Sequence, residues 1–381
     1  MENPKIRFKG FTKDWEQRKL GDDLVSIHTG TNLLGSITNT GMPLIKMGNI
    51  QRGYFDTSKV EFLAENEQPD KADIANYGDF FFNTRNTLEL VGKGATWMKN
   101  SGEYAFNSNI ARFELRNLDT IFFNYLYNTD YMTKQIHARA MGTTSVAAIY
   151  PRTLDSVEYL APCMKEQQKI GAYFKQLDHL ITLHQRKCEQ TKKLKKYMLQ
   201  KMFPQNGEKV PEIRFDGFTY DWEQRKLGDE AEEILAGGDI DKEKAVDDGV
   251  YPIYANALTN DGIVGYYDDY YRVKAPAVTV TGRGEVGRAR ARMIDFTPVV
   301  RLLAVRSNHD CYFLENAINN HKVVVESTGV PQLTVPQLSS YDICFPKDIV
   351  EEKKIGTYFN QLDRLITLHQ RQHKLHLNML L

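Results

Sequence analysis

The sequence lacks the features of several common protein classes. Its 381 residues contain only four cysteines, none of them in a C-x-x-C pair or near histidines at metal-ligand spacing, so a zinc site or a disulfide framework is not indicated. No apolar run approaches the ~20 residues that span a bilayer, and the N-terminus has no apolar signal-peptide segment. We therefore expect a cytoplasmic protein with free thiols.

An excess of charge of one sign is also missing. The chain has 49 basic and 49 acidic residues and a formal net charge of +0. A basic overall balance is the simplest electrostatic sign of nucleic-acid binding, so any such binding must come from local patches.

Enzyme signatures are absent as well. There is no G-x-x-x-x-G-K-[ST] phosphate loop and no G-x-G-x-x-G after a strand, and the segment 128–131 (NTDY) lacks the proline pair of an amino-methyltransferase motif. His369 and His373 are four residues apart and could share a metal on a helix, but they lie on an apolar seam where packing also explains them. We expect no catalytic, cofactor or metal site in this chain.

What the chain does contain is a long internal repeat. Residues 4–22 (PKIRFKGFTKDWEQRKLGD) return as residues 211–229 (PEIRFDGFTYDWEQRKLGD), and residues 170–186 (IGAYFKQLDHLITLHQR) return as residues 355–371 (IGTYFNQLDRLITLHQR). The inserts between these blocks do not repeat obviously. Two similar frames around two dissimilar inserts indicate one scaffold that holds two different readers.

Both inserts have the pattern of mixed α/β domains rich in sheet. Short β-rich runs at 79–84, 95–98 and 110–115 in the first insert are separated by Gly and Asn turns, and 121–140 has a helical pattern. In the second insert, 278–281 and 299–305 are predicted to be strands.

The repeated blocks after each insert predict two long amphipathic helices. Their apolar positions alternate in steps of four and three, which is the spacing of a coiled-coil seam. Asp348 is a candidate N-cap for the second helix. At the offset of 185 that relates the two blocks, Phe203 would match position 388, so the second helix is predicted about seven residues shorter. The residues predicted to pack between the helices are Ile170, Phe174, Leu177, Ile181, Ile355, Phe359, Leu362 and Ile366.

We expect the two helices to bury each other's apolar stripes as an antiparallel pair, which would relate the two halves by a pseudo-twofold axis. The alternative is two separate helices, each packed on its own domain.

The strongest local charge signal lies at 271–306. The sequence Arg288-Ala289-Arg290-Ala291-Arg292 alternates, so a strand would place its three arginines on one face. The preceding TGRGE segment (281–285) predicts a tight turn, and the whole predicts a basic β-hairpin. Guanidinium groups suit phosphates and guanine edges, whereas an edge strand charged against aggregation is the alternative. The candidate DNA contacts here are Arg283, Arg288, Arg290 and Arg292.

The first insert has a fainter counterpart, because 91–93 (VGK) parallels 286–288 (VGR). Its candidates are Arg85, Asn86 and Lys93. Two loops before the helices, 142–145 and 327–332, also align, and their small polar side chains could bond to phosphates or base edges. Their candidates are Thr143, Thr144, Thr328 and Gln332. Ordinary structural roles remain the alternative at all of these positions.

The duplicated frames, the segment 142–162 (GTTSVAAIYPRTLDSVEYLAP) and the helical blocks ending in LITLHQR resemble the DNA-specificity subunits of type I restriction–modification systems. The resemblance covers the whole chain. It implies an α+β chain whose two target-recognition domains are separated by two long helices in an antiparallel coiled coil. The implied segments are a first domain (1–162), a central helix (163–204), a second domain (205–346) and a short C-terminal helix (347–381).

The resemblance also implies the partners. Each domain would read one half of a split target on double-stranded DNA, and the helices would set the distance between the halves. Two modification (methyltransferase) subunits would supply S-adenosylmethionine, and restriction subunits would add ATP- and Mg-dependent translocation and cleavage. This chain would be a non-catalytic subunit without a cofactor of its own. The recognition domains vary within the family, so the candidate contacts above rest on charge and position alone.

Two other functions stay open on the residues themselves. A coiled-coil adaptor with two protein-binding domains would not need the basic hairpin. A standalone methyltransferase or nuclease would need the motifs that are missing.

Overall fold

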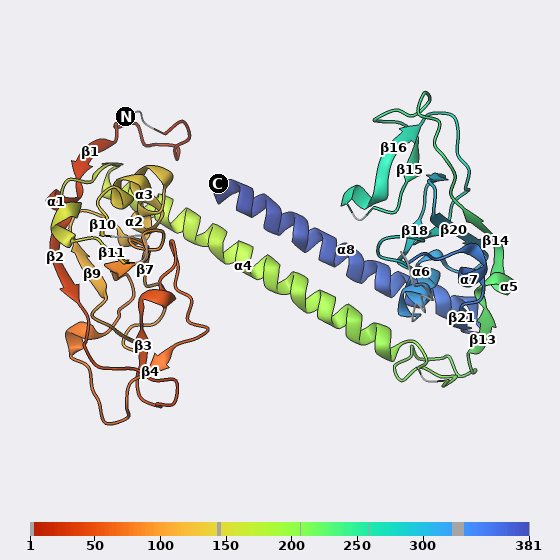
Figure 1. Cartoon of the computed structure of the whole chain (residues 1–381), viewed down its shortest axis with the longest axis horizontal. Coiled ribbons are helices and arrows are strands. Elements are labelled where there is room, and N and C mark those ends of the chain that lie inside the picture. The colour runs from red at the N-terminus through yellow and green to blue at the C-terminus, as the bar shows by residue number, and fades with distance from the viewer. Residues whose placement is uncertain (1–3, 143–145, 206, 258, 322–330, 381) are drawn as a thin grey trace. The chain divides into compact units, whose positions relative to one another are not determined.

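The computed structural model describes residues 4–142, 146–205, 207–257, 259–321 and 331–380 (Figure 1). The backbone divides into a first unit, Met1–Leu180 with Met379–Leu381, and a second unit, Ile181–Asn378. Within the described ranges, no helix combines the length and apolarity needed to cross a membrane. All four cysteines are free.

The first unit is built on an antiparallel four-stranded sheet of order β2-β9-β5-β7. Its strands are β2 (Leu24–Thr29), β9 (Ile110–Leu115), β5 (Phe80–Asn83) and β7 (Gly94–Thr96). The central strand β5 is buried on both faces, because Phe80 and Phe82 belong to one core cluster and Phe81 to another. The predicted strands at 79–84, 95–98 and 110–115 are confirmed as β5, β7 and β9.

The predicted helix at 121–140 is two helices, α2 (Thr120–Tyr127) and α3 (Asp130–His137). The break lies at Asn128 and Thr129, where the Thr129 hydroxyl accepts a hydrogen bond from the Met132 amide and caps α3. Threonine is a good N-cap, so a polar pair in an apolar pattern starts a new helix instead of continuing the old one.

Smaller elements complete this unit. A sheet of order β4-β3-β8 joins β4 (Glu61–Phe62), β3 (Pro43–Ile45) and β8 (Ala105–Phe106). Another, of order β10-β11-β6, joins β10 (Met141–Gly142), β11 (Ala147–Ala148) and β6 (Arg85–Asn86).

The second unit repeats the same sheet order with unrelated sequence, β14-β20-β17-β18. The strands are β14 (Ala231–Ala236), β20 (Leu302–Ser307), β17 (Ala277–Thr281) and β18 (Ala289–Arg292), with α6 (Cys311–Asn320) and α7 (Val335–Ser339). A second sheet of order β16-β15-β19 joins β16 (Ile263–Tyr267), β15 (Tyr251–Tyr254) and β19 (Thr297–Pro298). The predicted strand at 278–281 is confirmed as β17, whereas the one at 299–305 starts too early, because Arg301 has a positive φ of 71° just before β20.

The repeated frame closes each insert. In the first unit, β1 (Glu16–Lys19), which leads into the insert, pairs with β12 (Glu158–Ala161), which leaves it. In the second unit, β13 (Glu223–Lys226) pairs with β21 (Asp342–Phe345) in the same way. The short helices α1 (Leu20–Asp23) and α5 (Leu227–Glu230) follow the first strand of each pair.

The frame also anchors each long helix. Arg214 pairs with the buried Glu351 in the first turn of α8 (Ile349–Leu380), with Nε 2.6 Å from Oε1. Arg7 makes the equivalent pair with Glu166 in the first turn of α4 (Met164–Lys201). The bidentate pair that each arginine makes gives the arginine of both frame copies the same structural role. Asp348 caps α8 as expected, since its Oδ1 accepts from the Val350 amide at 2.8 Å.

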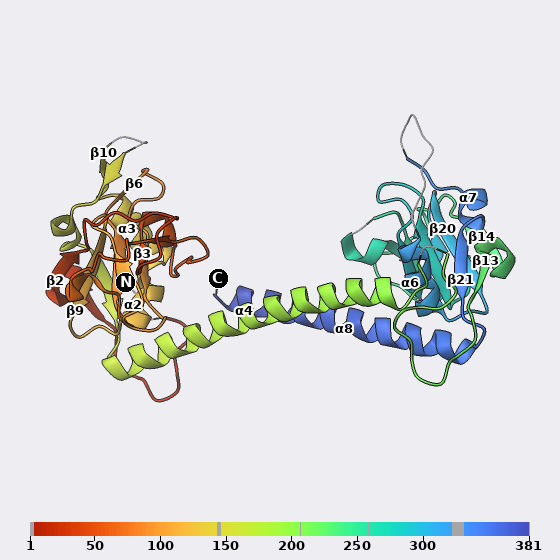
Figure 2. The same cartoon turned by 90° about the horizontal axis from the view of Figure 1, so that it is seen from below.

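Within the second unit, the C-terminal half of α4 runs antiparallel to α8, as both views show (Figures 1 and 2). Lys195 Nζ lies 2.7 Å from the Asp363 carboxylate, and His184 Nδ1 lies 3.1 Å from His369 Nδ1. The lower-numbered partner on α4 meets the higher-numbered partner on α8, so the predicted antiparallel pairing is confirmed.

The predicted seam is only partly a helix–helix seam. Ile355, Phe359 and Leu362 belong to the core of the second unit, which the end of α4 enters through Met202 and Phe203. On α4, Ile170 packs against the core of the first unit, and the Phe174 ring lies 5.2 Å from the Tyr125 ring of α2. Leu177 is buried, and Ile181 and Ile366 are half-buried. The first four turns of each helix therefore pack on its own unit, and Phe359 also meets Phe203, just past the end of α4, with the ring centres 6.0 Å apart.

Candidate nucleic-acid interface

The basic segment forms the predicted hairpin. β17 and β18 pair antiparallel with Val280 opposite Ala289 and Ala277 opposite Arg292. Gly284 and Gly287 in the connecting loop have φ values of 79° and 83°, which glycine adopts without strain. Because β18 is the last strand of its sheet, the hairpin lies at an edge.

The outer backbone of β18 is not open for pairing with another strand. The Ala289 amide donates to Asn319 Oδ1 at 2.8 Å, Asn319 Nδ2 donates to the Ala289 carbonyl, and the Ala291 amide donates to Glu315 Oε2 at 3.1 Å. Both polar side chains come from α6, and burial raises the pKa of Glu315. Since α6 already covers this edge, protection against aggregation is a weak reason for the arginines.

The alternation of β18 is as predicted, because Ala289 is buried, Ala291 packs against the core, and the arginines lie on the other face. Their exposure is unequal. The side chains of Arg288 and Arg290 are 60% and 56% exposed, whereas that of Arg292 is 7% exposed. Arg288 pairs with Glu285 at 3.1 Å, a contact that is open to solvent. Two arginines, not three, are therefore presented to a ligand.

The segment before α8 meets this hairpin. Arg283 and Gln332 form an isolated antiparallel bridge, and the Leu333 amide donates to the Gly282 carbonyl at 2.9 Å. Both Arg283 and Gln332 are exposed, so two of the predicted contacts are brought together. Thr328 lies outside the described residues.

The first unit has the same arrangement. β6 carries Arg85 and Asn86 and pairs with β11, which precedes α4 as Gln332 precedes α8. Arg85 is exposed and Asn86 is half-buried. Lys93 is half-buried and donates to Gln51 Oε1 at 2.8 Å; burial, together with the nearby Arg52, lowers the pKa of its ammonium. Thr143 and Thr144 lie outside the described residues.

Other residues at these surfaces were missed by sequence reasoning. Arg52 is exposed and lies 3.1 Å from His137 Nε2, and burial together with this arginine lowers the pKa of His137. Nothing in the sequence around Arg52 indicates a site. Asp261, which bonds to both Arg290 and Arg292, lies in a TNDG segment whose composition does indicate a turn.

In the described part of the chain, no group of three or more His, Cys, Asp or Glu side chains is arranged to hold a metal ion. His369 contacts His184 on the facing helix, as the packing interpretation of the seam expects.

The model of the type I restriction modification DNA specificity domain matches residues 12–193 and again residues 220–378. The chain belongs to this family. The duplicated match follows the duplicated frame, and it covers most of both units. The chain is thus a DNA target-recognition subunit of a type I system and not a catalytic one, and the adaptor alternative is not favoured.

Two named relatives agree with this. The chain is 25% identical over 282 residues to a type I specificity subunit of Mycoplasma pneumoniae, covering 68% of this chain and 72% of the relative. It is 24% identical over 395 residues to the specificity subunit of a type I restriction enzyme of Methanocaldococcus jannaschii, covering 94% and 89%.

A solved structure supports the fold. The crystal structure of the S subunit of a type I restriction–modification system from M. genitalium matches with a TM-score of 0.67 at 14% identity, covering 99% of this chain and 96% of that one.

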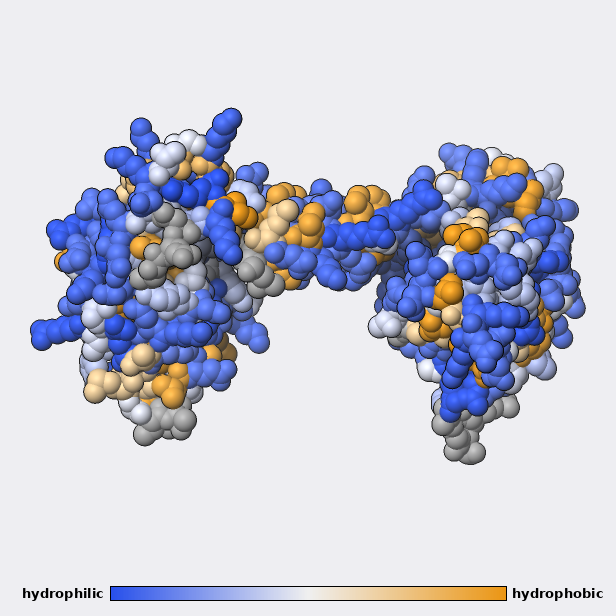
Figure 3. All heavy atoms as spheres, turned by 90° about the horizontal axis from the view of Figure 1, so that it is seen from above, coloured by the Kyte–Doolittle hydropathy of each residue, from blue (hydrophilic) through white to orange (hydrophobic). Residues whose placement is uncertain are grey.

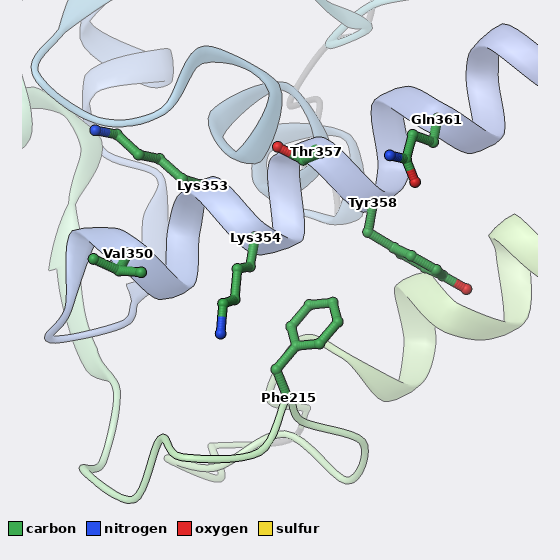
Figure 4. A pocket seen from close by; sticks show the side chains of 7 residues that line it. All are labelled: Phe215, Val350, Lys353, Lys354, Thr357, Tyr358 and Gln361. Carbon is green, nitrogen blue, oxygen red and sulfur yellow. The ribbon is translucent and has the colours of Figure 1, made fainter.

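The specificity subunit has a second exposed surface, formed by the frame and α8. A shallow pocket of about 350 Å³ is lined by Phe215, Lys353, Lys354 and Tyr358, among others. Figure 4 shows Lys354 and Tyr358 projecting from α8 on either side of Phe215. The Phe215 and Tyr358 rings meet edge to face at 6.2 Å, and Lys354 Nζ lies 4.8 Å from the centre of the Phe218 ring. We call this the aromatic–lysine surface of the second unit.

The first unit repeats the surface. The Phe8 and Tyr173 rings meet edge to face at 5.9 Å, and Lys169 Nζ lies 5.0 Å from the centre of the Phe11 ring. Phe8 and Tyr173 are 36% and 42% exposed. The equivalent rings of the second unit, Phe215 and Tyr358, are half-buried, so the same aromatic and lysine pairs recur in both units with more ring surface exposed in the first.

Several leucines of α8 are also exposed. Leu365, Leu368, Leu375 and Leu377 are between 40% and 48% exposed, and hydrophobic residues are visible on the helical region in Figure 3.

Proposed function

We propose that the two units read the two unlike halves of one split DNA target and so direct modification and restriction subunits to it. One observation carries this proposal. In each unit, exposed basic side chains lie next to the segment that precedes the long helix of that unit in the sequence. Arg283 lies there in the second unit, in the loop of the hairpin that also carries the exposed Arg288 and Arg290, and Arg85 lies there in the first. The flanking residues differ between the units, which agrees with two different half-sites.

The remaining predicted contacts, Arg283, Gln332, Asn86 and Lys93, complete these two surfaces. We assign the target-recognition domains to 1–162 and 205–346 and the helices to 163–204 and 347–381. Since its substrate is the DNA of the cell, we place the subunit in the cytoplasm.

Selection from a random DNA library tests the reading function. The specificity subunit is co-purified with its modification subunit, and bound DNA is sequenced for the wild type and for Arg288→Ala/Arg290→Ala and Arg85→Ala variants. We expect a split motif with a fixed gap, weakened in one half by the first variant and in the other half by the second. A folded complex that enriches no motif would contradict the proposal and return the adaptor alternative.

We also propose that two modification subunits dock, one on each unit. The aromatic–lysine surfaces support this, because they are alike in the two units whereas the DNA-reading surfaces differ. A surface that is alike in both units is expected to bind the same kind of partner on each. The exposed leucines of α8 offer apolar area for the same purpose. S-adenosylmethionine belongs to these subunits, and ATP with Mg belongs to the restriction subunits.

Native mass spectrometry of the co-purified complex tests the stoichiometry. Lys354→Glu and Lys169→Glu each reverse a charge on an exposed side chain of one aromatic–lysine surface. We expect each single variant to lose one modification subunit and the double variant to lose both. Retention of two subunits by the double variant would remove these surfaces from the interface.

The spacer between half-sites is expected to follow from the helices. α4 continues without a break from one unit into the other. Removing four residues, 190–193, shortens it by about 6 Å, which corresponds to roughly two base pairs. We expect selection to return a changed gap with both half-sites retained, whereas alanine at the same four positions should leave the gap unchanged. A changed half-site with the old gap would contradict this assignment.

A further inference from the structure

Arg292 is held from several directions at once. Its guanidinium Cζ lies 3.7 Å from the centre of the Tyr254 ring, and Nε donates to Thr279 Oγ1 at 3.1 Å. Nη1 donates to Asp261 Oδ2 at 2.7 Å, and Nη2 donates to the Asp261 carbonyl at 3.1 Å. With all three nitrogens engaged and 7% of the side chain exposed, Arg292 has a structural task in this arrangement and is not presented to DNA.

The task of Arg292 is to hold Asp261. The other carboxylate oxygen of Asp261, Oδ1, lies 2.8 Å from Arg290 Nε in an ion pair. One carboxylate thus connects a buried arginine to an exposed one. The Asp261 side chain is itself 42% exposed, so the Asp261–Arg290 pair faces the outside of the hairpin.

The turn that carries Asp261 has a costly backbone. Asn260, Asp261 and Gly262 have consecutive positive φ values of 49°, 55° and 80°. Asparagine, aspartate and glycine are the residues that tolerate this region best, and such strain persists only where the surroundings enforce it. Here the hydrogen bonds from Arg292 to the carboxylate and the carbonyl of Asp261 hold the turn in this conformation.

A second contact ties the neighbouring chain to the hairpin loop. Asn256 Oδ1 accepts from the Gly282 amide at 2.9 Å, and Asn256 Nδ2 donates to the Val300 carbonyl at 3.2 Å. The chain before the 259–262 turn is therefore fixed to the base of the loop that contains Arg283. Hydrogen bonds thus join Asn256 to the hairpin loop, and an ion pair joins Asp261 of the turn to Arg290 of the hairpin.

A carboxylate on a surface that must approach phosphates is unfavourable unless it is needed there. Asp261 restricts Arg290, a long side chain that would otherwise sample many rotamers. An arginine whose Nε is paired with a fixed carboxylate keeps its two Nη groups available, and these are the donors that pair with O6 and N7 of guanine.

We propose that Arg290 reads a guanine in the half-site of the second unit, and that Asp261, anchored by Arg292, is the positioning residue that fixes this preference. This inference rests on the proposed DNA-reading function. Arg292 and the turn 259–262 thereby acquire a role in specificity without touching the base.

The test is the same random-library selection, with each position of both half-sites scored separately. Asp261→Asn keeps the shape of the side chain and removes its charge. We expect one strongly selected guanine in the second half-site of the wild type, and a loss of preference at that position of at least about fivefold in the variant, since a bidentate contact discriminates by roughly 1–3 kcal/mol. Every position of the first half-site should be unchanged.

Two further variants keep the result interpretable. Arg290→Lys retains the charge but not the fork, so it should lose the same guanine preference with overall affinity largely kept. Glu232→Gln removes the partner of Arg306 in an exposed pair elsewhere on the same sheet and should change no position. Thermal unfolding of each complex identifies a variant that fails to fold, in which case Arg290→Lys alone decides.

An unchanged guanine preference in both Asp261→Asn and Arg290→Lys would overturn this inference while leaving the split motif, and with it the proposed function, intact. Uniform weakening of both half-sites by Asp261→Asn would overturn it as well. Failure of the wild type to select any motif is the distinct result that contradicts the proposed function.

Discussion

Gly356 in α8 offers a sharp test of how the long helices are attached to the domains. A Cβ placed on Gly356 would lie 2.0 Å from Asp310 Oδ1 and 2.9 Å from the Phe313 amide nitrogen. Asp310 is the N-cap of α6, and its Oδ1 accepts from that same amide at 2.9 Å. The first turn of α6 therefore abuts α8 at the one position where α8 has no side chain.

The expected loss of stability on Gly356→Ala follows from three contributions. Overpacking against backbone costs about 1–3 kcal/mol. Displacing the Asp310 carboxylate removes a cap that contributes about 1 kcal/mol. Alanine in a helix returns about 0.8–1 kcal/mol relative to glycine. The net destabilisation of the second unit should be about 1–3 kcal/mol.

Gly171 in α4 is the matched control. Its Cβ would meet the Phe122 amide nitrogen at 2.8 Å, but the cap carboxylate of Asp119 only at 3.3 Å. The α2 cap can therefore remain, and Gly171→Ala should cost less, about 0–2 kcal/mol by the same reasoning. Gly48→Ala gives a baseline, because its Cβ would meet nothing within 4 Å.

Denaturant unfolding, combined with hydrogen exchange of the α2 and α6 amides, measures the two units separately. The reasoning is refuted if Gly356→Ala is neutral or stabilising, or if α6 amides keep their protection in that variant.

Other predictions concern charges. Arg214→Met leaves the buried Glu351 unpaired and should destabilise the second unit by about 2–3 kcal/mol. Breaking a fully buried pair costs ~3–5 kcal/mol, and the loss here is smaller because Arg214 is partly exposed. In denaturant unfolding, the double variant with Glu351→Leu should recover most of the lost stability. Burial opposes the charge of His309, but hydrogen bonds to Glu352 and Glu230 outweigh it and raise the pKa of His309. Because the pKa is raised, the contribution of His309 to stability is complete below the ordinary histidine pKa and is lost as pH rises through the raised value. The stability of the second unit, measured against pH, should therefore fall in that range. The variant His309→Leu should flatten this profile. Arg288→Ala should weaken DNA binding at every sequence and reduce the salt slope by about one, and an unchanged slope would remove it from the phosphate contacts.

Much of the architecture could be predicted from the sequence because local periodicity and internal repeats determine it. The two frames, the two long helices, the Asp348 cap and the β17–β18 hairpin follow from patterns that a few neighbouring residues determine. The missing catalytic motifs agree with the family of the chain, and two duplicated blocks around dissimilar inserts indicated two readers.

The tertiary structure decided which segments pack against these helices and strands and which of their side chains are exposed. An apolar stripe does not specify its partner, and only the fold shows that Ile170 and Phe174 contact the first unit. Two inserts without obvious similarity share one sheet order, because many sequences satisfy the same alternation of buried and exposed positions. Period two places Arg290 and Arg292 on one face of β18, but contacts of Arg292 with Tyr254, Thr279 and Asp261 leave it buried while Arg290 stays exposed. Exposure depends on contacts between distant segments, and those contacts exist only in the folded chain.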